Sequence, residues 1–398
     1  MFKKSFKWPK EIIIFWIIDF LLGLELIGPV LLIFFKDWGG LNQTEIQTLQ
    51  SWFTLCIFLL EIPTGVFGDT HGKKNSVLLG YALTAVGTVV YTLTPNIYLF
   101  ALSELIFAFG VAFISGAKEA LVYEVSDELG LKNRFRHISV VSSTLHMLGM
   151  IAASIIIFFI GDLLEPQVLF RIGSITSIIS FVLLWVFIKE RNVPKKEKSL
   201  KPNYFATAKE GFKILRNTSN LKRIAIYTSI IGATSYFVIW LYQESLRVMS
   251  VPENMYGIYR AVLLIAEMIA MRFLAYLIEK ISLRKTMIYV AILVAVGFIL
   301  AALFQNVFGI IMVLSLSGGL GLQIPSVMSK DINGEITGEQ RATVLSFMSM
   351  ARRLALTIFN PFIGLLVDNK GVFFAFAVLG VISLFAIFFK SKRIVFGK

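Results

Sequence analysis

Residues 11–35 read EIIIFWIIDFLLGLELIGPVLLIFF, an apolar run that carries only three acidic side chains. A hydrocarbon core about 30 Å thick needs roughly 20 helical residues to cross it. The apolar core of a signal peptide is shorter, about 7–15 residues, and a small-residue cleavage site follows it. The stretch therefore predicts a first membrane span that is not cleaved.

The composition of the whole chain agrees with a membrane protein. Of 398 residues, 57% are hydrophobic and 16% are charged, and the mean hydropathy is +0.77. A soluble domain of this size needs more charge to cover its surface. The single cysteine, Cys56, excludes a disulfide within the chain, and three scattered histidines offer little for metal catalysis. We expect no metal and no cofactor.

Similar apolar runs recur along the chain, separated by short polar loops. They predict an all-α membrane protein with twelve transmembrane helices, which we number in chain order. We place them at residues 11–35, 45–67, 75–94, 97–123, 137–161, 166–188, 221–246, 255–278, 285–304, 306–329, 341–366 and 371–389.

Basic residues divide unevenly between the two sides that these spans define. With the N-terminus inside, the cytoplasmic segments, counted with the cytoplasmic ends of the spans, hold 29 Lys and Arg, and the outer loops hold three. Cytoplasmic loops of membrane proteins carry such an excess. We therefore expect a multi-pass protein of the cell (inner) membrane with both termini cytoplasmic. The distribution also explains the net charge of +13 without any nucleic-acid partner.

The longest loop divides the chain into halves of six spans. We expect an N-terminal bundle at 1–188, a cytoplasmic linker at 189–220 and a C-terminal bundle at 221–398. Residues 203–217 have an apolar helical face, which favours an amphipathic helix on the inner leaflet; a solvated linker helix is the alternative.

The two halves echo each other. The segment from Gly65 to Lys74, GVFGDTHGKK, follows the second span, and the segment from Ala275 to Arg284, AYLIEKISLR, follows the eighth, 210 residues later. Arg134 and Ser139 near the fifth span match Arg341 and Ser346 near the eleventh, 207 residues later. A six-helix unit used twice is typical of many secondary transporters.

The first of these segments resembles the loop 2–3 signature of the major facilitator superfamily, G-x-x-x-D-x-x-G-[RK]-[RK]. All five defining positions match: Gly65, Asp69, Gly72, Lys73 and Lys74. The resemblance implies the major facilitator fold, and within it a gate where the aspartate faces the N-terminus of helix 11, near Arg341, with Arg134 or Lys73 as a cationic partner. For the two lysines, the alternative is that they only mark the inner face.

Polar residues inside spans are expensive, so they are candidates for function. In the superfamily, the helices that carry these residues line the central cavity or its gates. The resemblance therefore implies the same position here. The candidates for proton coupling or the substrate cavity are Asp19, Glu25, Glu104, Trp240, Gln243, Glu244, Glu267, Gln323 and Arg352.

Glu25 stands four residues before Pro29, which has no N–H to donate to the Glu25 carbonyl. A carboxylate and an orphaned carbonyl at one place near mid-membrane suit a proton or a cation, and some drug–proton antiporters of the superfamily are similar here. The alternative is a static ion pair with an arginine such as Arg352. Arg352 and Arg353 lie about 100° apart on a helix, so only one of them can face the cavity.

Together these features predict a secondary active transporter, with proton-coupled efflux of amphipathic compounds as the leading hypothesis. Many exporters of the superfamily carry a Gly- and Pro-rich signature in helix 5, whereas this helix has Gly149 but no proline. The direction of transport therefore stays open, and uptake of a nutrient or metabolite is an alternative. A non-transporting receptor is a further alternative. No nucleotide-binding loop and no nucleophile–base set occurs, so we expect neither an ATP-driven pump nor an enzyme. The expected partners are a small-molecule substrate, a proton or another coupling ion, and lipid, with the protein as a monomer.

Overall fold

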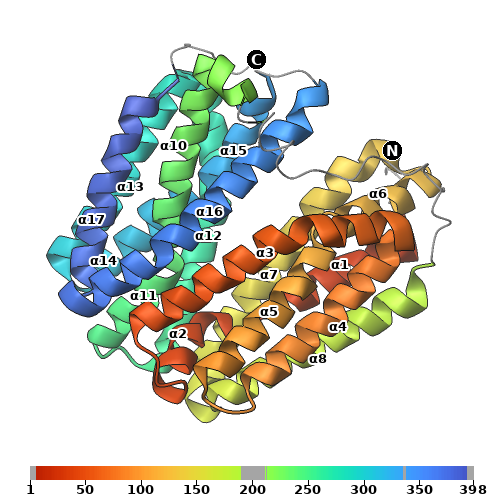
Figure 1. Cartoon of the computed structure of the whole chain (residues 1–398), viewed down its shortest axis with the longest axis horizontal. Helices are drawn as coiled ribbons and strands as arrows, with labels where there is room; N and C mark the ends of the chain where they lie inside the picture. The colour runs from red at the N-terminus through yellow and green to blue at the C-terminus, as the bar shows by residue number, and fades with distance from the viewer. Residues whose placement is uncertain (1–5, 190–210, 212, 335–337, 392–398) are drawn as a thin grey trace, which may run out of the picture. The chain divides into compact units, whose positions relative to one another are not determined.

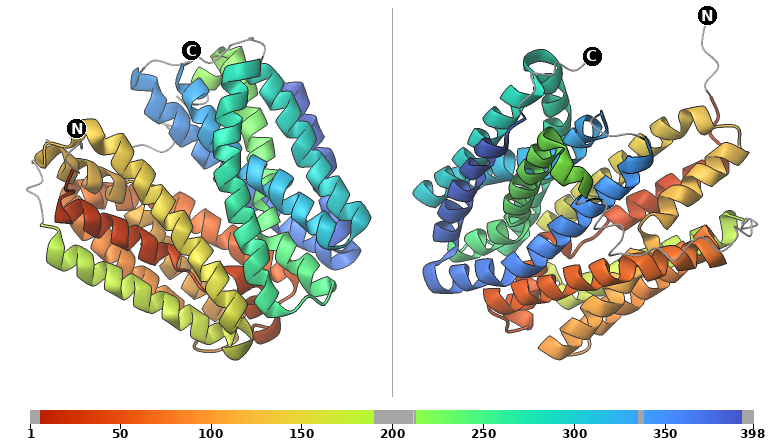
Figure 2. Two further views of the ribbon diagram at one scale, coloured as in Figure 1. Left: turned by 180° about the vertical axis from the view of Figure 1, so that it is seen from behind. Right: turned by 45° about the horizontal axis from the view of Figure 1, so that its top comes forward.

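The computed structural model describes residues 6–189, 211, 213–334 and 338–391, and within 329–342 only the course of the backbone. Every regular element in this described part is a helix, as predicted. The chain forms two compact units, one of residues 1–34 and 55–200 and one of residues 35–54 and 201–398. Figures 1 and 2 show each unit as a bundle of long helices.

The first half of the chain supplies the N-terminal unit (residues 1–34 and 55–200) and also residues 35–54, which belong to the C-terminal unit. The elements are α1 (Lys10–Gly23), η1 (Gly28–Val30), α2 (Leu31–Ile33), η2 (Phe34–Trp38), α3 (Gln43–His71), α4 (Lys73–Tyr91), α5 (Ile97–Ile114), α6 (Ala117–Glu128), η3 (Lys132–Arg134), α7 (Phe135–Ile160), η4 (Gly161–Leu163) and α8 (Pro166–Phe187).

The second half supplies the rest of the C-terminal unit. Its elements are α10 (Ser219–Tyr236), α11 (Val238–Val248), η5 (Glu253–Met255), α12 (Tyr256–Ile281), α13 (Leu283–Phe304), α14 (Val307–Met312), η6 (Val313–Leu320), α15 (Gly321–Gly334), α16 (Gly338–Lys370), α17 (Val372–Phe385) and η7 (Ala386–Phe389). The predicted amphipathic helix at 203–217 lies mostly outside the described residues.

Eleven helical stretches of the described chain are long and apolar enough to cross a membrane. They coincide with eleven of the twelve predicted spans. The remaining one, at 75–94, corresponds to α4, whose 19 residues begin with the polar sequence Lys73-Lys74-Asn75 and so have a lower mean hydropathy.

Four of the spans are not the continuous helices that the apolar runs predicted. The first breaks between α1 and η1, the fourth at Ser115 and Gly116, and the seventh at Phe237, while the tenth winds as a π-helix from Val313 to Leu320. These are the first helices of four successive groups of three. Gly116 has φ +73°, which a glycine adopts without the strain that a side chain would add. Non-α geometry within a span is tolerated where protein or a cavity satisfies the backbone, so the breaks direct attention to these four helices.

Glycines bring other helices into close contact. A Cβ built on Gly23 of α1 would lie 2.2 Å from the carbonyl oxygen of His146 in α7, and one built on Gly149 of α7 would lie 2.3 Å from that of Phe20. Small residues let helices approach in this way in membranes, where water does not drive them together. Gly149 of helix 5 therefore has a packing role, which explains a glycine at this position without any exporter signature.

The two halves share an unusual backbone conformation at one equivalent position. Gly72, before α4, has φ 98° and ψ 145°, and Ser282, before α13 and 210 residues later, has φ 100° and ψ 151°. This region is open to glycine and strained for other residues. The match in conformation agrees with the repeat seen in the sequence.

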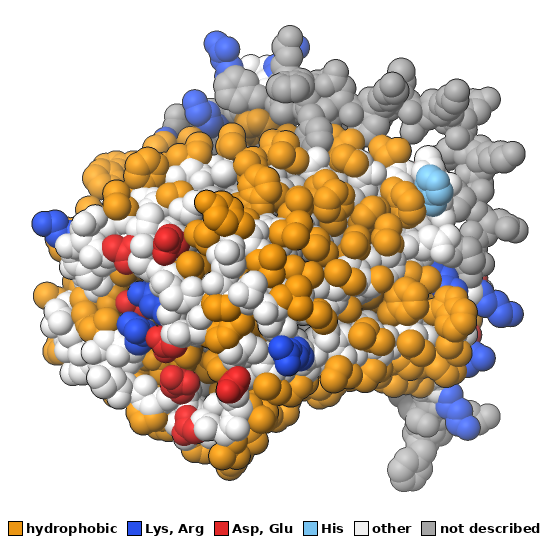
Figure 3. All heavy atoms as spheres, turned by 60° about the horizontal axis from the view of Figure 1, so that its bottom comes forward, with side chains coloured by type: hydrophobic (Ala, Val, Ile, Leu, Met, Phe, Trp, Pro, Cys, Tyr) orange, Lys and Arg blue, Asp and Glu red, His pale blue; other side chains and the backbone are white. Residues whose placement is uncertain are grey.

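Large apolar side chains lie exposed on both bundles. Phe159, Trp185 and Leu303 are 70%, 62% and 72% exposed. Figure 3 shows hydrophobic side chains over much of one face, with most of its acidic side chains gathered in one part. A soluble monomer rarely exposes apolar surface on this scale, so lipid is its natural solvent.

Replacing Ser282 by glycine should stabilise the protein. The change removes backbone strain of roughly 1–3 kcal/mol at a cost of about 0.5–1 kcal/mol in chain entropy. The Ser282 hydroxyl is buried and has no hydrogen-bond partner among the described residues, so its loss costs little. Thermal unfolding of the purified protein in detergent measures the effect. Gly72→Ser, the reverse substitution at the equivalent position, should lower the unfolding temperature. A Ser282→Gly protein that unfolds at a lower temperature than the wild type would contradict this explanation.

The predicted topology can be tested with two exposed positions. In a Cys56→Ala background, Tyr98→Cys, before α5, should react with an impermeant thiol reagent in intact cells, because Tyr98 is 83% exposed and is predicted outside. Asn75→Cys, at the exposed beginning of α4, should react only after lysis. Cys56→Ala alone is the control. The reverse labelling pattern would contradict cytoplasmic termini.

Candidate functional site

The signature segment forms the junction of α3 and α4. Asp69 lies in the last turn of α3 and is 72% exposed at its side chain, and Gly72 makes the turn. The carboxylate of Asp69 forms an ion pair with Lys73 at the beginning of α4. Lys74 is buried, and its Nζ donates to the carbonyl oxygen of Trp185 at 3.1 Å. Gly65 lies one turn earlier in α3, and a Cβ built on it would meet no atom within 4 Å.

Of the two arginines predicted beside this segment, the structure describes the side chain of Arg134 only, and Arg134 takes another position. The guanidinium of Arg134 lies over the ring of Phe6, 3.8 Å from the centroid, and Asp69 pairs with Lys73. Of the two cations proposed for Asp69, Lys73 is the one that the structure brings to it. Arg341 lies in the first turns of α16, and its side chain falls outside the description.

Buried carboxylates lie in the first and fourth spans. Asp19 of α1 forms an ion pair with Lys118 of α6, and its carbonyl oxygen lies 3.2 Å from Nδ1 of His146. Glu104 of α5 is 4% exposed. The sequence marks Lys118 as a charge within a span but does not place it beside Asp19.

Glu25 lies in the break of the first span, between α1 and η1. The expectation of an orphaned carbonyl is wrong, because the N–H of Gly28 donates to the Glu25 carbonyl at 3.2 Å after the chain leaves the helix at Gly23. The carboxylate itself is exposed, and no hydrogen bond or ion pair to it occurs within the described residues. Glu25 therefore presents a free carboxylate inside an apolar span of 29 residues, Lys10–Trp38.

The C-terminal unit holds a second polar group. Oε2 of Glu267 in α12 accepts a hydrogen bond from Nε2 of Gln323 in α15 at 2.8 Å. Trp240 and Gln243 are buried in α11; Nε1 of Trp240 lies 3.3 Å from the Tyr236 hydroxyl, and Nε2 of Gln243 donates to the carbonyl of Ile239. Glu267 and Gln323, predicted separately, thus form one pair.

Glu244 has a partner that the sequence did not suggest. Its Oε1 lies 2.9 Å from Nζ of Lys36, and the two side chains are only 8% and 11% exposed. From the sequence, Lys36 counts as an outer-loop residue. One Glu244 oxygen is thus already engaged, while Oε2 has no partner within the described part of the chain.

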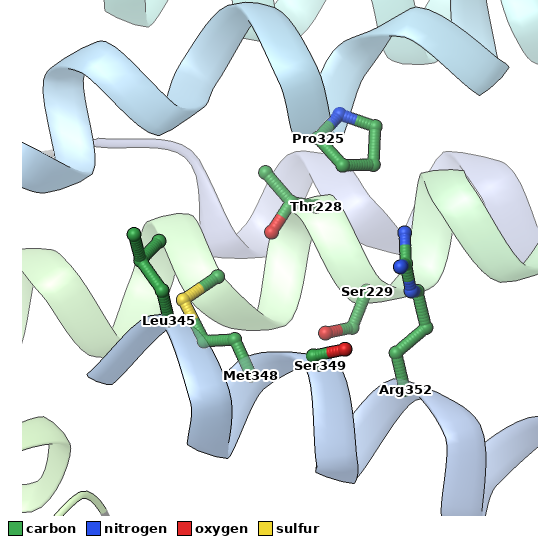
Figure 4. A pocket seen from close by; sticks show the side chains of 7 residues that line it. All are labelled: Thr228, Ser229, Pro325, Leu345, Met348, Ser349 and Arg352. Atoms are coloured by element: carbon green, nitrogen blue, oxygen red, sulfur yellow. The ribbon is translucent and has the colours of Figure 1, made fainter. Parts of the chain in front are cut away.

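Arg352 lines a cavity inside the C-terminal unit, together with residues of α10, α15 and α16 (Figure 4). The cavity measures about 160 Å³. Four of its residues recur along α16 at the spacing i, i+3, i+4 and i+7, which places them on one helical face. The lining consists of Thr228, Ser229, Pro325, Leu345, Met348, Ser349 and Arg352. Arg353, the neighbour of Arg352, is not part of it.

Two features of the C-terminal unit were not predicted from the sequence. The first is the set of cavity hydroxyls: those of Thr228 and Ser229 interrupt an apolar stretch of α10, and Ser349 precedes Arg352 by one turn. This spacing in the sequence could have indicated a polar cavity.

The second feature is Asp368, near the end of α16. Its carboxylate accepts from the backbone N–H groups of Gln43 and Thr44, at 3.1 and 2.8 Å, and from the Thr44 hydroxyl at 2.6 Å. It thereby caps the N-terminus of α3, a favourable place for a negative charge.

No group of three or more His, Cys, Asp or Glu within the described residues could hold a metal ion.

Comparison with known families gives a match along nearly the whole chain. The family described as Major Facilitator Superfamily matches residues 13–266 and 248–394. Quinolone resistance protein NorA of Staphylococcus aureus is 24% identical over 175 residues, 44% of this chain and 43% of NorA. An uncharacterised MFS-type transporter of Methanocaldococcus jannaschii is 28% identical over 111 residues, 27% of this chain and 28% of that protein. These matches thus span less than half the length of either relative.

Solved structures extend the likeness of fold. The nucleoside transporter NupG superimposes with a TM-score of 0.77 at 14% identity, covering 96% of this chain and 98% of that one. A D-xylose–proton symporter gives a TM-score of 0.73 at 12% identity, covering 97% of both chains. The predicted twelve-helix fold is confirmed by these likenesses, which at such identity concern the fold alone.

Proposed function

The chain belongs to the major facilitator superfamily of membrane transporters, and from this premise we propose that it exports amphipathic compounds in exchange for protons. We place it in the cell (inner) membrane as a monomer with cytoplasmic termini. The proposal concerns the coupling ion, the direction and the substrate class.

The free carboxylate of Glu25 carries the proposal. An ionisable group within an apolar span is costly unless water, a partner or a proton compensates it. Asp19 and Glu244 each have a lysine partner, and Glu267 has Gln323. Glu25 has no such partner in the described part of the chain, and it stands where the first helix is broken. Discontinuous helices near mid-membrane are where secondary transporters place their ion and substrate sites.

A proton on Glu25 can be linked to substrate by electrostatics. A carboxylate in an apolar phase favours its protonated form, whereas water or an arriving cation favours the ionised form. Proton release would thus accompany the opening of the cavity to water, and protonation its closure. An alternating carboxylate of this kind couples proton entry to the opposite movement of substrate.

Two carboxylates at the ends of α3 suit the alternating gates. Asp368 caps the N-terminal end of α3, and Asp69 lies at its C-terminal end. By its resemblance to the family signature, Asp69 would hold the inner gate closed by facing the N-terminus of α16. We propose that the two contacts close opposite sides in turn.

The choice of amphipathic substrates rests on the partial similarity to NorA, whose name records quinolone resistance, and on the aromatic residues Tyr236 and Trp240 at the break of the seventh span. Proteoliposomes with an imposed pH gradient test it. A fluorescent quinolone and ethidium serve as amphipathic probes, and uridine and xylose as polar ones. Proton-driven movement of an amphipathic probe supports export; movement of only the polar probes would replace it by nutrient uptake, and no movement of any probe would favour a receptor.

Glu25→Gln should abolish accumulation driven by the pH gradient, because the amide mimics a permanently protonated carboxyl. Downhill exchange of the same probe between equal pH values should persist. Glu165→Gln, at an exposed glutamate before α8, is the matched control and should behave as the wild type. If Glu25→Gln still concentrates the probe with the wild-type pH dependence, Glu25 is not the coupling site, and Asp19 or Glu267 becomes the next candidate.

Asp69→Asn should slow transport but leave membrane insertion and substrate binding largely intact. The amide keeps the shape and loses a charge–dipole interaction of roughly 0.3–2 kcal/mol, which shifts a two-state equilibrium by a factor of about two to thirty. Initial rates of probe flux give the readout. Asp127→Asn, in the exposed pair with Lys132, is the control. Wild-type flux in Asp69→Asn would show that this segment does not gate the protein.

A further inference from the structure

The cavity beside Arg352 is lined by hydroxyl and guanidinium donors, most of which have no acceptor among the described residues. The Thr228 hydroxyl donates to the carbonyl of Ala225 at 3.0 Å. The hydroxyls of Ser229 and Ser349 and the guanidinium of Arg352 form no hydrogen bond or ion pair with the described residues. In Figure 4, Ser229 extends from α10 and Ser349 from α16 into the same space, with the Arg352 side chain beside them.

The charge of this cavity is unbalanced. Its described lining includes no acidic residue, and Arg352 takes part in none of the ion pairs of the described chain. Arg352 is half-buried, and a cation withdrawn from water normally has a paired anion. Arginine also presents planar, paired N–H groups that match a carboxylate. The missing partner is therefore an anion with oxygen acceptors.

Size and lining restrict that anion further. About 160 Å³ is well below the roughly 300–1,000 Å³ of a site that encloses a whole drug-sized ligand. The space suits an anionic end group and a few carbons. Pro325, Leu345 and Met348 provide an apolar wall next to the donors, which a hydrocarbon or aromatic portion of the ligand would contact.

We propose that this cavity binds the carboxylate end of an amphipathic organic anion, with Arg352, Ser229 and Ser349 as its donors. The inference rests on the proposed function, because it names the substrate class of that transporter. It adds a recognition site in the C-terminal unit to the proton site at Glu25.

Equilibrium binding to the purified, detergent-solubilised protein tests the proposal without requiring transport. Three probes share one skeleton: 4-phenylbutyrate, its neutral amide and 4-phenylbutylamine. We expect saturable binding of the carboxylate with a dissociation constant of about millimolar or tighter. The amide should bind about tenfold or more weakly, and the amine should not compete. Absence of saturable carboxylate binding, or equal binding of carboxylate and amide, would overturn the proposal.

Variants locate the site. Arg352→Gln should weaken carboxylate binding about tenfold or more and leave amide binding unchanged, so that the discrimination disappears. Arg352→Lys should retain part of the preference because it keeps the charge. Arg353→Gln removes the same charge one position away and should retain the full preference; elution volume and melting temperature verify that each variant is folded. Carboxylate preference in a folded Arg352→Gln protein equal to that of the wild type would overturn the assignment.

The two proposals can fail separately. Carboxylate binding without proton-driven flux in proteoliposomes would retain this site and refute the transport proposal. Flux of ethidium or a quinolone without any carboxylate preference would retain the transporter and refute this site.

Discussion

The backbone in lipid must satisfy its own hydrogen bonds, and the rest of this structure depends on that constraint. Each unpaired N–H or C=O in hydrocarbon costs several kcal/mol, so a span is normally one continuous helix. Eight of the predicted spans obey this rule closely, whereas the first, fourth, seventh and tenth depart from it. Departures of this kind persist where protein or a wet cavity replaces the missing bonds. Their spacing of three helices indicates a repeated unit whose first helix carries the exceptions.

Close packing makes the exceptions possible. Gly23 and Gly149 bring α1 against α7 next to the break that contains Glu25, and Gly321 lies against Ser235 where α15 meets α10. Beside Gly23 and Gly149, the break satisfies part of its own backbone, with the N–H of Gly28 donating to Glu25 and that of Val30 to Ile27. The same tight surroundings hold polar pairs such as Glu267 with Gln323 in fixed geometry. The tightly packed glycines and the irregular backbone therefore occur side by side in the first span.

Much of the fold could be read from the sequence, because apolar length and loop charge act locally. The signature from Gly65 to Lys74 likewise indicated its own turn, and Gly72 makes it. The break at Phe237 could not be predicted, because phenylalanine is ordinary in a helix, whereas Ser115-Gly116 is a pair at which helices often kink. Glu25 suggested an orphaned carbonyl that Gly28 in fact satisfies, and Lys36 was not matched to Glu244 because 208 residues separate them. Periodicity along α16 held enough information to place Arg352 with Ser349, but not to bring α10 to them.

Two charged groups without a partner among the described residues differ in sign: the carboxylate of Glu25 in the N-terminal unit and the guanidinium of Arg352 in the C-terminal unit. We propose that the carboxylate exchanges protons and the guanidinium binds substrate. The central claim is therefore that substrate movement is coupled to proton movement. The most direct measurement follows proton movement itself, with a trapped pH indicator in proteoliposomes to which a quinolone gradient is applied at equal pH. The account predicts that an outward quinolone gradient drives protons inward in the wild-type protein. Quinolone movement with no change in internal pH would contradict it.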